Sequence, residues 1–257
     1  MTLEIEQIPV LTDNYIYLLR DTASGACAVV DPALAEPVLA RLAARGLTLD
    51  LIFNTHHHGD HVGGNLELKR ATGCRIIGPA ADAARIPGID ETVGDGDETA
   101  LGSARARVFD VPGHTRGHIA YWFADDQALF CGDTLFALGC GRLFEGTPAQ
   151  MWRSLSKLRA LPGATRVYCA HEYTQANARF ALSLENDNPA LRARAAAVDR
   201  AREQGRPTVP STLAEEIATN PFLRADQEGL RRALGPAFAA ADAVTILGET
   251  RRRKDVF

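Results

Sequence analysis

Up to about residue 172, short apolar runs alternate with segments whose apolar residues recur at helical spacing. The runs YIYLLR (15–20), ACAVVD (26–31) and LDLIFNT (49–55) are rich in β-branched and aromatic residues, which favour strands. Residues 31–46 show a helical repeat that stops at Gly46, a residue type that commonly terminates helices. Further strands are predicted at 74–78, 104–111, 118–124, 127–133 and 166–170, and further helices at 65–73 and 148–163. Alternating strands and helices indicate a mixed α/β protein built in layers.

From about residue 174 the composition shifts toward alanine, arginine, glutamate and leucine. The runs QANARFALSLE, PALRARAAAVDRAREQG and STLAEEIA have helical patterns, and prolines punctuate this part of the chain. Its first convincing strand pattern is VTIL (244–247). We therefore predict two domains, an α/β domain at residues 1–173 and a helical domain at residues 174–257.

Composition limits the classes of function and the compartment. The net charge of −4 gives no electrostatic support for binding nucleic acid, and no apolar run approaches the roughly 20 residues that a membrane span needs. The five cysteines are scattered and never form a CxxC pair, which suits reduced thiols in the cytosol. The first residues lack a basic segment followed by an apolar run, so we expect no signal peptide and a cytoplasmic location.

Four of the seven histidines lie in one segment, THHHGDH (55–61), directly after a predicted strand. In an extended segment, His56 and His58 are two residues apart and their side chains fall on the same side. Asp60 and His61 follow a glycine, where the chain can turn and face another way. The segment can therefore supply ligands to two adjacent metal ions.

Three further candidate ligands lie at the ends of other predicted strands. His114 lies in VPGHTRGH, Asp133 ends the strand 127–133, and His171 follows the strand 166–170. Imidazole and carboxylate ligands suit zinc, manganese or iron. Because a carboxylate has two oxygens, Asp133 is the natural ligand to be shared by two ions. The spacing does not decide which ion His114 and His171 each serve.

The ligand motifs resemble those of a known superfamily. HxHxDH (56–61), PGHTxGH, CGDTLF and AHEYT are similar to the metallo-β-lactamase superfamily. Within it, four other stretches resemble the glyoxalase II (hydroxyacylglutathione hydrolase) family: IPVLTDNYIYLL, GCGRLFEGT (139–147), NPFLR (220–224) and RRRKD (251–255). The resemblance implies a metallo-β-lactamase αββα sandwich, residues 1–173, as the catalytic domain. The helical domain at 174–257 would then contribute to substrate binding.

The resemblance also assigns the ligands of two divalent ions, with zinc expected and iron or manganese as alternatives. It places His56, His58 and His114 on the first ion. It places Asp60, His61 and His171 on the second, with Asp133 bridging both. The resemblance also makes Asp60 and Asp133 the expected catalytic residues. His57 and His118 have no ligand role in the motif, although His118 could orient a ligand.

The implied activity is hydrolysis of S-D-lactoylglutathione, and of other 2-hydroxyacyl-glutathiones, to glutathione and D-lactate by a hydroxide held by the two ions. This is the second step of methylglyoxal detoxification. The family holds glutathione with basic and tyrosyl groups, and Arg142, Tyr173, Arg251 and Lys254 fall at those positions. Phe144 stands where a tyrosine is common, so one hydroxyl is lost. We expect a monomer that acts on this small molecule without nucleic acid or membrane.

A metal-assisted route suits this reaction. Free hydroxide is scarce at neutral pH, and a metal ion lowers the pKa of bound water from 15.7 to about 7. The leaving thiolate belongs to a thiol with a pKa near 8.5, so no strong general acid is needed. The sequence contains no GxSxG nucleophile motif, which disfavours an acyl-enzyme.

Two alternatives remain at this point. One is an enzyme similar to the persulfide dioxygenases, which share the fold, use one iron and act on glutathione persulfide; Asp60 and the NPFLR and RRRKD stretches favour the hydrolase over it. The other is a binding module on a degenerate fold, which predicts missing ligands.

Overall fold

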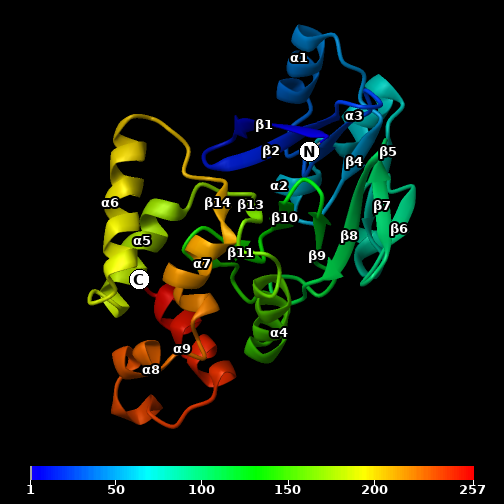
Figure 1. Ribbon diagram of the computed structural model, residues 1–257. Coiled ribbons are helices and arrows are strands. Elements are labelled where there is room, and N and C mark those ends of the chain that lie inside the picture. Colours follow the sequence, from blue (N-terminus) through cyan, green and yellow to red (C-terminus); the bar gives the residue numbers. More distant parts are fainter. Residues whose placement is uncertain (1) are drawn as a thin grey trace. The chain divides into compact units, whose positions relative to one another are not determined.

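The computed structural model describes residues 2–257 and has a mixed α/β architecture (Figure 1). Its internal packing divides it into two compact units. Unit 1 contains residues 2–110 and Arg116–Gly132, and unit 2 contains Val111–Thr115 and Asp133–Phe257. The division into domains at residues 1–173 and 174–257 was inferred from the sequence pattern and stays a prediction.

Unit 1 contains a six-stranded sheet in which the strands follow sequence order. Its strands are β1 (Leu3–Val10), β2 (Asn14–Asp21), β3 (Cys27–Val30), β4 (Leu51–Phe53), β5 (Arg75–Pro79) and β6 (Glu91–Val93). The pairs β1–β2 and β2–β3 are antiparallel, and the pairs from β3 to β6 are parallel. Parallel neighbours need crossover connections. Helix α1 (Glu36–Arg45) supplies the first and helix α3 (Asn65–Thr72) the second, and η1 (Ala80–Arg85) lies in the third.

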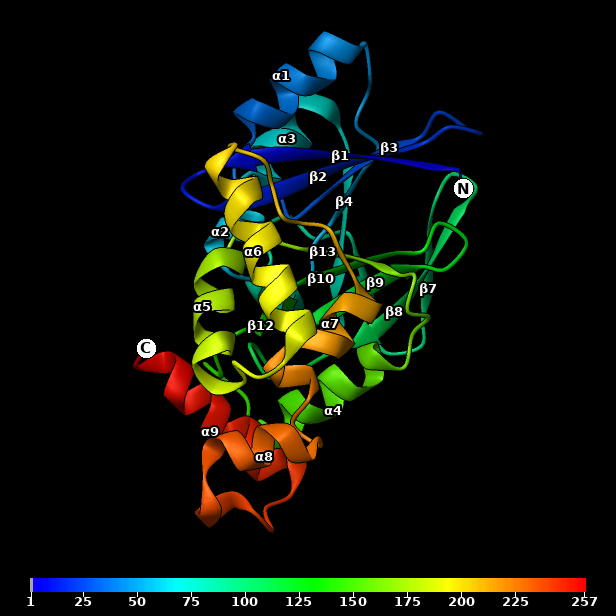
Figure 2. The same cartoon turned by 60° about the vertical axis from the view of Figure 1, so that its left-hand side comes forward.

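One face of this sheet is covered by α1 and α3 (Figure 2). Val29 and Ile52 belong to a buried cluster on this face, together with Val38 and Leu42 of α1 and Leu68 of α3. The predicted helix at 31–46 begins only at Glu36 and ends, as predicted, at Gly46, which has a φ of 62°.

A second, antiparallel group of strands in unit 1 packs against the other face. It consists of β7 (Glu98–Leu101), β8 (Ala104–Asp110), β9 (Ile119–Phe123) and β10 (Ala128–Gly132), each paired with the next. The ring of Tyr17 in β2 lies 5.5 Å from that of Phe130, and Phe53 lies 5.1 Å from Tyr121. The Tyr121 hydroxyl donates to the carbonyl of Asn54 (3.0 Å). Aromatic packing thus fixes the end of β4, from which the histidine-rich segment continues.

Unit 2 is mainly helical. It contains α4 (Pro148–Arg159), α5 (Thr174–Leu184), α6 (Pro189–Glu203), α7 (Leu213–Thr219), α8 (Glu228–Leu234) and α9 (Ala243–Asp255), with the short helices η2 (Pro221–Leu223) and η3 (Pro236–Phe238). Two short antiparallel strand pairs accompany them, β11 (Leu135–Phe136) with β12 (Gly139–Cys140) and β13 (Arg166–Cys169) with β14 (Ser211–Thr212). Helices α5 and α6 lie side by side in both views, joined by a buried cluster that includes Ala178 and Leu191 (Figures 1 and 2).

Polar side chains set the starts of several of these helices. Thr147 and Thr212 form capping boxes at α4 and α7, and the Asn188 side chain accepts two backbone N–H groups at α6. Such caps satisfy donors that the first helical turn leaves open.

The prediction of a strand at VTIL (244–247) is wrong, because these residues lie in the first turns of helix α9. The Asp242 side chain accepts from the backbone N–H of Thr245 and caps the helix. Ile246, Leu247 and Thr250 are then buried on one helical face, so packing outweighs the strand preference of the β-branched residues.

All five cysteines are buried thiols. Burial raises the pKa of the Cys140 thiol to about 11 and that of Cys169 to about 12, so these thiols stay protonated at neutral pH. Within residues 2–257, no helix is both long enough and apolar enough to cross a membrane.

Candidate metal centre and the adjoining cavity

The histidine-rich segment (residues 55–61) is fixed at its start by Asp31, a buried residue that follows β3. One oxygen of Asp31 accepts from the backbone N–H of Thr55 (2.8 Å), and the other accepts from the Thr55 hydroxyl (2.7 Å). The same hydroxyl lies 3.1 Å from Nδ1 of His56. The parallel register of β3 and β4 places these groups together, because both strands end at the same edge of the sheet.

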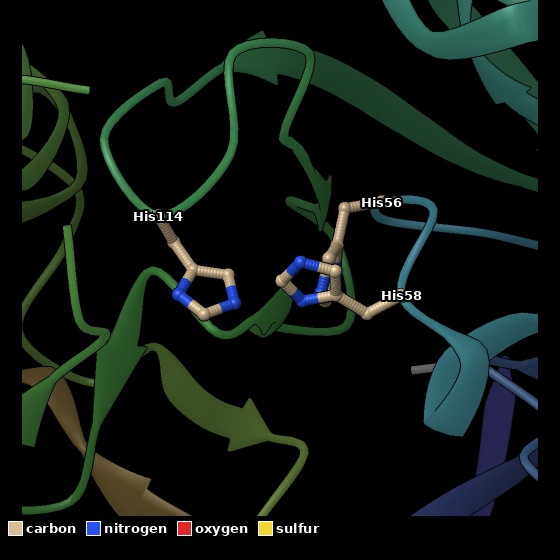
Figure 3. A group of neighbouring side chains, drawn as sticks. All are labelled: His56, His58 and His114. Atoms are coloured by element: carbon tan, nitrogen blue, oxygen red, sulfur yellow. The ribbon is translucent and has the colours of Figure 1, made fainter. Parts of the chain in front are cut away.

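The structure brings His56 and His58 together. Nε2 of His56 lies 3.1 Å from Nδ1 of His58. In Figure 3 their rings overlap beside the segment that follows β4, and His114, also drawn, comes from a loop after β8. With zinc–nitrogen distances of 2.0–2.1 Å and tetrahedral geometry, two nitrogens of one ion lie about 3.3 Å apart. The spacing of the first two histidines therefore fits two ligands of one ion.

Asp60 and His61 form a second pair on the short helix α2 (Gly59–Val62). Nε2 of His61 lies 3.5 Å from Oδ2 of Asp60, and Nδ1 of His61 lies 3.1 Å from Oδ2 of Asp31. Asp31 therefore contacts both Thr55 and a predicted ligand. Its ligand atom also lies within 4.8 Å of those of His56 and His61. Asp31 was not among the predicted residues, because its only signal in the sequence is a carboxylate at the end of an apolar strand.

The two histidines without a predicted ligand role have distinct surroundings. The ring of His118 stacks on that of His56, with centroids 4.5 Å apart and an interplanar angle of 18°. Nδ1 of His118 lies 2.9 Å from the carbonyl oxygen of Ile119. His57 turns instead toward Asp82, with 3.0 Å between Nδ1 and Oδ2.

The backbone of Gly132 approaches this group closely. Its φ is 46°, and a Cβ at this position would lie 2.3 Å from the Thr55 hydroxyl oxygen and 2.9 Å from the His118 ring. Only glycine satisfies both the backbone conformation and the contact.

In unit 2, Asp133 lies between two predicted ligands. Its Oδ2 is 3.4 Å from Nε2 of His114, and its Oδ1 is 3.3 Å from Nε2 of His171. The two oxygens thus face different histidines, which suits a carboxylate shared by two ions. Nδ1 of His114 lies 2.9 Å from the carbonyl oxygen of Arg142. A proton on Nδ1 donated to that carbonyl leaves Nε2 available as a ligand atom.

A cavity of about 560 Å³ lies in unit 2, and we call it the unit 2 cavity. Its lining includes the predicted ligands His114 and Asp133 and all the predicted substrate residues, namely Arg142, Phe144, Tyr173, Arg251 and Lys254. Phe136, Cys140, Ala176, Asn177, Asp255 and Phe257 complete the lining. The structure therefore brings the predicted substrate residues together around one hollow next to two predicted ligands.

Arg251 is the buried one among the basic residues that line the unit 2 cavity. It donates to the carbonyl of Cys140 (2.7 Å) and pairs with Asp255 (3.1 Å). Its guanidinium also lies over the ring of Phe222, 5.1 Å from the centroid. Arg142 is largely exposed and lies 3.7 Å from the same Asp255 carboxylate.

Lys254 packs against two aromatic rings and donates to the carbonyl of Ala176 (3.3 Å). Its Nζ lies 5.3 Å from the ring centre of Phe180 and 5.4 Å from that of Phe257. Burial, followed by the charges of nearby arginines beginning with Arg251, lowers the pKa of Lys254 to about 8. Phe144 is exposed, and its ring lies 5.2 Å from that of His114.

Comparison with known proteins places the chain in a family. Two family models match it: the metallo-beta-lactamase superfamily over residues 11–171 and the hydroxyacylglutathione hydrolase C-terminus over residues 172–257. The chain is 64% identical over 255 residues to a hydroxyacylglutathione hydrolase from Methylococcus capsulatus, with 99% of each chain covered. The chain belongs to the hydroxyacylglutathione hydrolase family.

A second member of the hydroxyacylglutathione hydrolase family, from Rhodospirillum rubrum, is 61% identical over 256 residues, covering 100% of this chain and 99% of the relative. Among solved structures, that of TTHA1623 in a di-iron-bound form has a TM-score of 0.62 at 25% identity, covering 86% of this chain and 100% of the other. The predicted fold class is confirmed: a metallo-β-lactamase fold followed by the helical C-terminal region of the hydroxyacylglutathione hydrolases.

Proposed function

We propose that this protein hydrolyses S-D-lactoylglutathione, and other 2-hydroxyacyl thioesters of glutathione, to glutathione and the free 2-hydroxy acid. The observation that carries the proposal is the unit 2 cavity, in which basic side chains and the ligands His114 and Asp133 share one lining. The family supports it, because relatives at 64% and 61% identity over nearly their full length are named hydroxyacylglutathione hydrolases.

We propose that the protein holds two divalent ions, with zinc expected and iron or manganese as alternatives. His56, His58 and His114 (Figure 3) would hold one ion and Asp60, His61 and His171 the other, with Asp133 shared. The donor set fits, because it combines imidazole and carboxylate groups and contains no thiolate. The spacings of 3.1–3.5 Å inside the His56–His58, Asp60–His61 and Asp133–His171 pairs fit as well.

The bound ions would supply an activated water at neutral pH and stabilise the negative charge that develops on the carbonyl oxygen. The protein's own residues would bind and orient the substrate. Glutathione carries two carboxylates and one ammonium, so its net negative charge matches Arg251, Lys254 and Arg142 along the unit 2 cavity. A volume of about 560 Å³ lies within the range of small-molecule sites. Phe144 offers only an apolar surface there.

Family membership favours this activity over that of a mononuclear iron enzyme acting on glutathione persulfide. A degenerate binding module predicts missing ligands, and every residue of the proposed ligand set is present. The proposals that the protein works as a monomer in the cytoplasm, without nucleic acid or membrane partners, rest on the sequence alone.

The test combines metal analysis with a thioester assay. The purified, zinc-loaded protein should bind two ions per chain and cleave S-D-lactoylglutathione. The matched control substrate is the D-lactoyl thioester of N-acetylcysteamine, which lacks the charged groups of glutathione and should show a much lower kcat/KM. Intact glutathione thioester in the presence of fully loaded protein, or a single ion with oxygen uptake on glutathione persulfide, would contradict the proposal.

A further inference from the structure

Asn14 connects the first hairpin of unit 1 to the histidine-rich segment. It is the first residue of β2, pairs with Val10 across the hairpin, and is buried. The turn before it contains Leu11 at a φ of 52°, a left-handed conformation that costs a non-glycine residue free energy. The hairpin therefore follows a constrained path that ends at a buried amide.

The Asn14 side chain contacts one predicted ligand directly. Its Nδ2 donates to Oδ2 of Asp60 at 2.9 Å and lies 3.4 Å from the Asp60 carbonyl oxygen. Asp60 is separated from it by 46 residues and lies on α2, a helix of only four residues. Its side chain is 40% exposed, and its Oδ2 also lies 3.5 Å from Nε2 of His61. The Asn14 amide adds a hydrogen-bond donor that is anchored in a strand of the sheet.

We propose that Asn14 is a positioning residue that orients the carboxylate of Asp60 for the second ion and thereby raises the affinity of that site alone. The inference rests on the proposed function, which makes Asp60 a ligand. A neutral amide suits this task because it fixes one carboxylate oxygen and leaves the negative charge for the cation. A lysine or arginine at position 14 would neutralise that charge, and an aspartate would repel it.

The effect is confined to one ion because the first pair of ligands is oriented by other groups. The Thr55 hydroxyl contacts Nδ1 of His56, and the ring of His118 stacks on His56. Asn14 takes part in neither contact, so we expect both to remain when its side chain is replaced. Losing a hydrogen bond that orients a ligand costs about 10- to 100-fold in metal affinity.

The experiment titrates the metal-free full-length protein with Zn²⁺ in competition with a coloured chelator, which resolves two stepwise dissociation constants. Asn14→Ala removes the side chain, and Asn14→Leu keeps its bulk without the donor. In both variants we expect one of the two constants to rise about 10- to 100-fold while the other stays within about twofold of the wild type. The control is Asn188→Ala, which removes an amide from the start of α6 and should leave both constants unchanged.

The outcomes separate this inference from the proposed function. Unchanged constants in both folded Asn14 variants, in a wild type that binds two ions and cleaves the thioester, would overturn only the role of Asn14. Equal weakening of both constants with a lower unfolding temperature would also overturn it, since that pattern shows a general structural role. A wild type that binds one ion would overturn the proposed function together with this inference.

Discussion

The ring of Tyr173 lies flat against the imidazole of His171, with centroids 4.7 Å apart and an interplanar angle of 2°. Phe136 packs edge-on against both rings, 5.8 Å from His171 and 5.3 Å from Tyr173. Tyr173 also lines the unit 2 cavity. Tyr173 therefore contacts a proposed metal ligand and lines the proposed substrate site. Its ring should affect metal binding, and its hydroxyl should affect substrate binding.

The variant Tyr173→Phe keeps the stacked ring and removes only the hydroxyl. If that hydroxyl binds glutathione, its loss should raise KM by about three- to tenfold, the usual contribution of one hydrogen bond, with kcat and zinc content unchanged. Tyr173→Ala removes the ring as well and should lower zinc content too. Steady-state kinetics and metal analysis of the two variants check this. A Phe variant with the wild-type KM would remove the hydroxyl from the substrate site.

The pKa of about 8 for Lys254 predicts a pH dependence of substrate binding. Because burial lowers this pKa, the ammonium loses its proton as the pH rises through 8, and its attraction for an anionic substrate is lost. We expect KM for S-D-lactoylglutathione to rise between pH 7 and pH 9. The matched variant Lys254→Arg stays charged throughout this range and should flatten the profile. Parallel KM profiles for wild type and variant would show that another group titrates.

The variant Asp133→Asn tests the shared carboxylate. The wild-type carboxylate has two oxygens that share one negative charge, with Oδ1 facing His171 and Oδ2 facing His114. The amide of the variant has a single, neutral oxygen. We expect zinc content to fall and kcat to drop by orders of magnitude. Asp226→Asn, which removes an ion pair with Arg159 elsewhere in unit 2, is the control and should retain activity. Near-normal turnover with two ions bound in the Asp133 variant would exclude its bridging role.

Three of the four segments that carry proposed ligands could be located from the sequence because each follows a short apolar strand. β4 and β10 are buried along their whole length, and β13 is buried after its first residue, so their apolar runs are unambiguous and the polar residues that follow them are easily located. β1 was missed because its side chains alternate irregularly between buried and exposed, with charged residues among the apolar ones.

The residues that orient the ligands could not be predicted in the same way. Asp31 contacts Thr55, and Asn14 contacts Asp60, across 24 and 46 residues of sequence. These contacts depend on the order and register of the strands, and a local pattern carries no information about either. The helix at 244–247 shows the same limit, since burial in the folded chain decides between two local preferences.

The variant Gly132→Ala tests the close packing behind His56. A Cβ there would lie 2.3 Å from the Thr55 hydroxyl oxygen, at a backbone conformation that suits glycine. We expect a loss of about 1–3 kcal/mol in the free energy of unfolding and weaker zinc binding, because Thr55 and His118 must move. Gly25→Ala is the control: its φ is 83°, yet nothing lies within 4 Å of the added carbon. Equal losses in both variants would show that only backbone strain matters. Thermal unfolding and zinc titration measure both effects.

The number of residues in helix α9 determines the direction in which its last side chains point. Ile246 and Leu247 anchor its start in the interior, and Arg251 and Lys254 line the unit 2 cavity one to two turns later. Removing one residue between these two pairs would turn the last part of the helix by about 100°, which would point both cations elsewhere without changing the composition. Natural variation should therefore substitute exposed positions such as Arg252 freely, while single-residue insertions and deletions in this stretch should be rare.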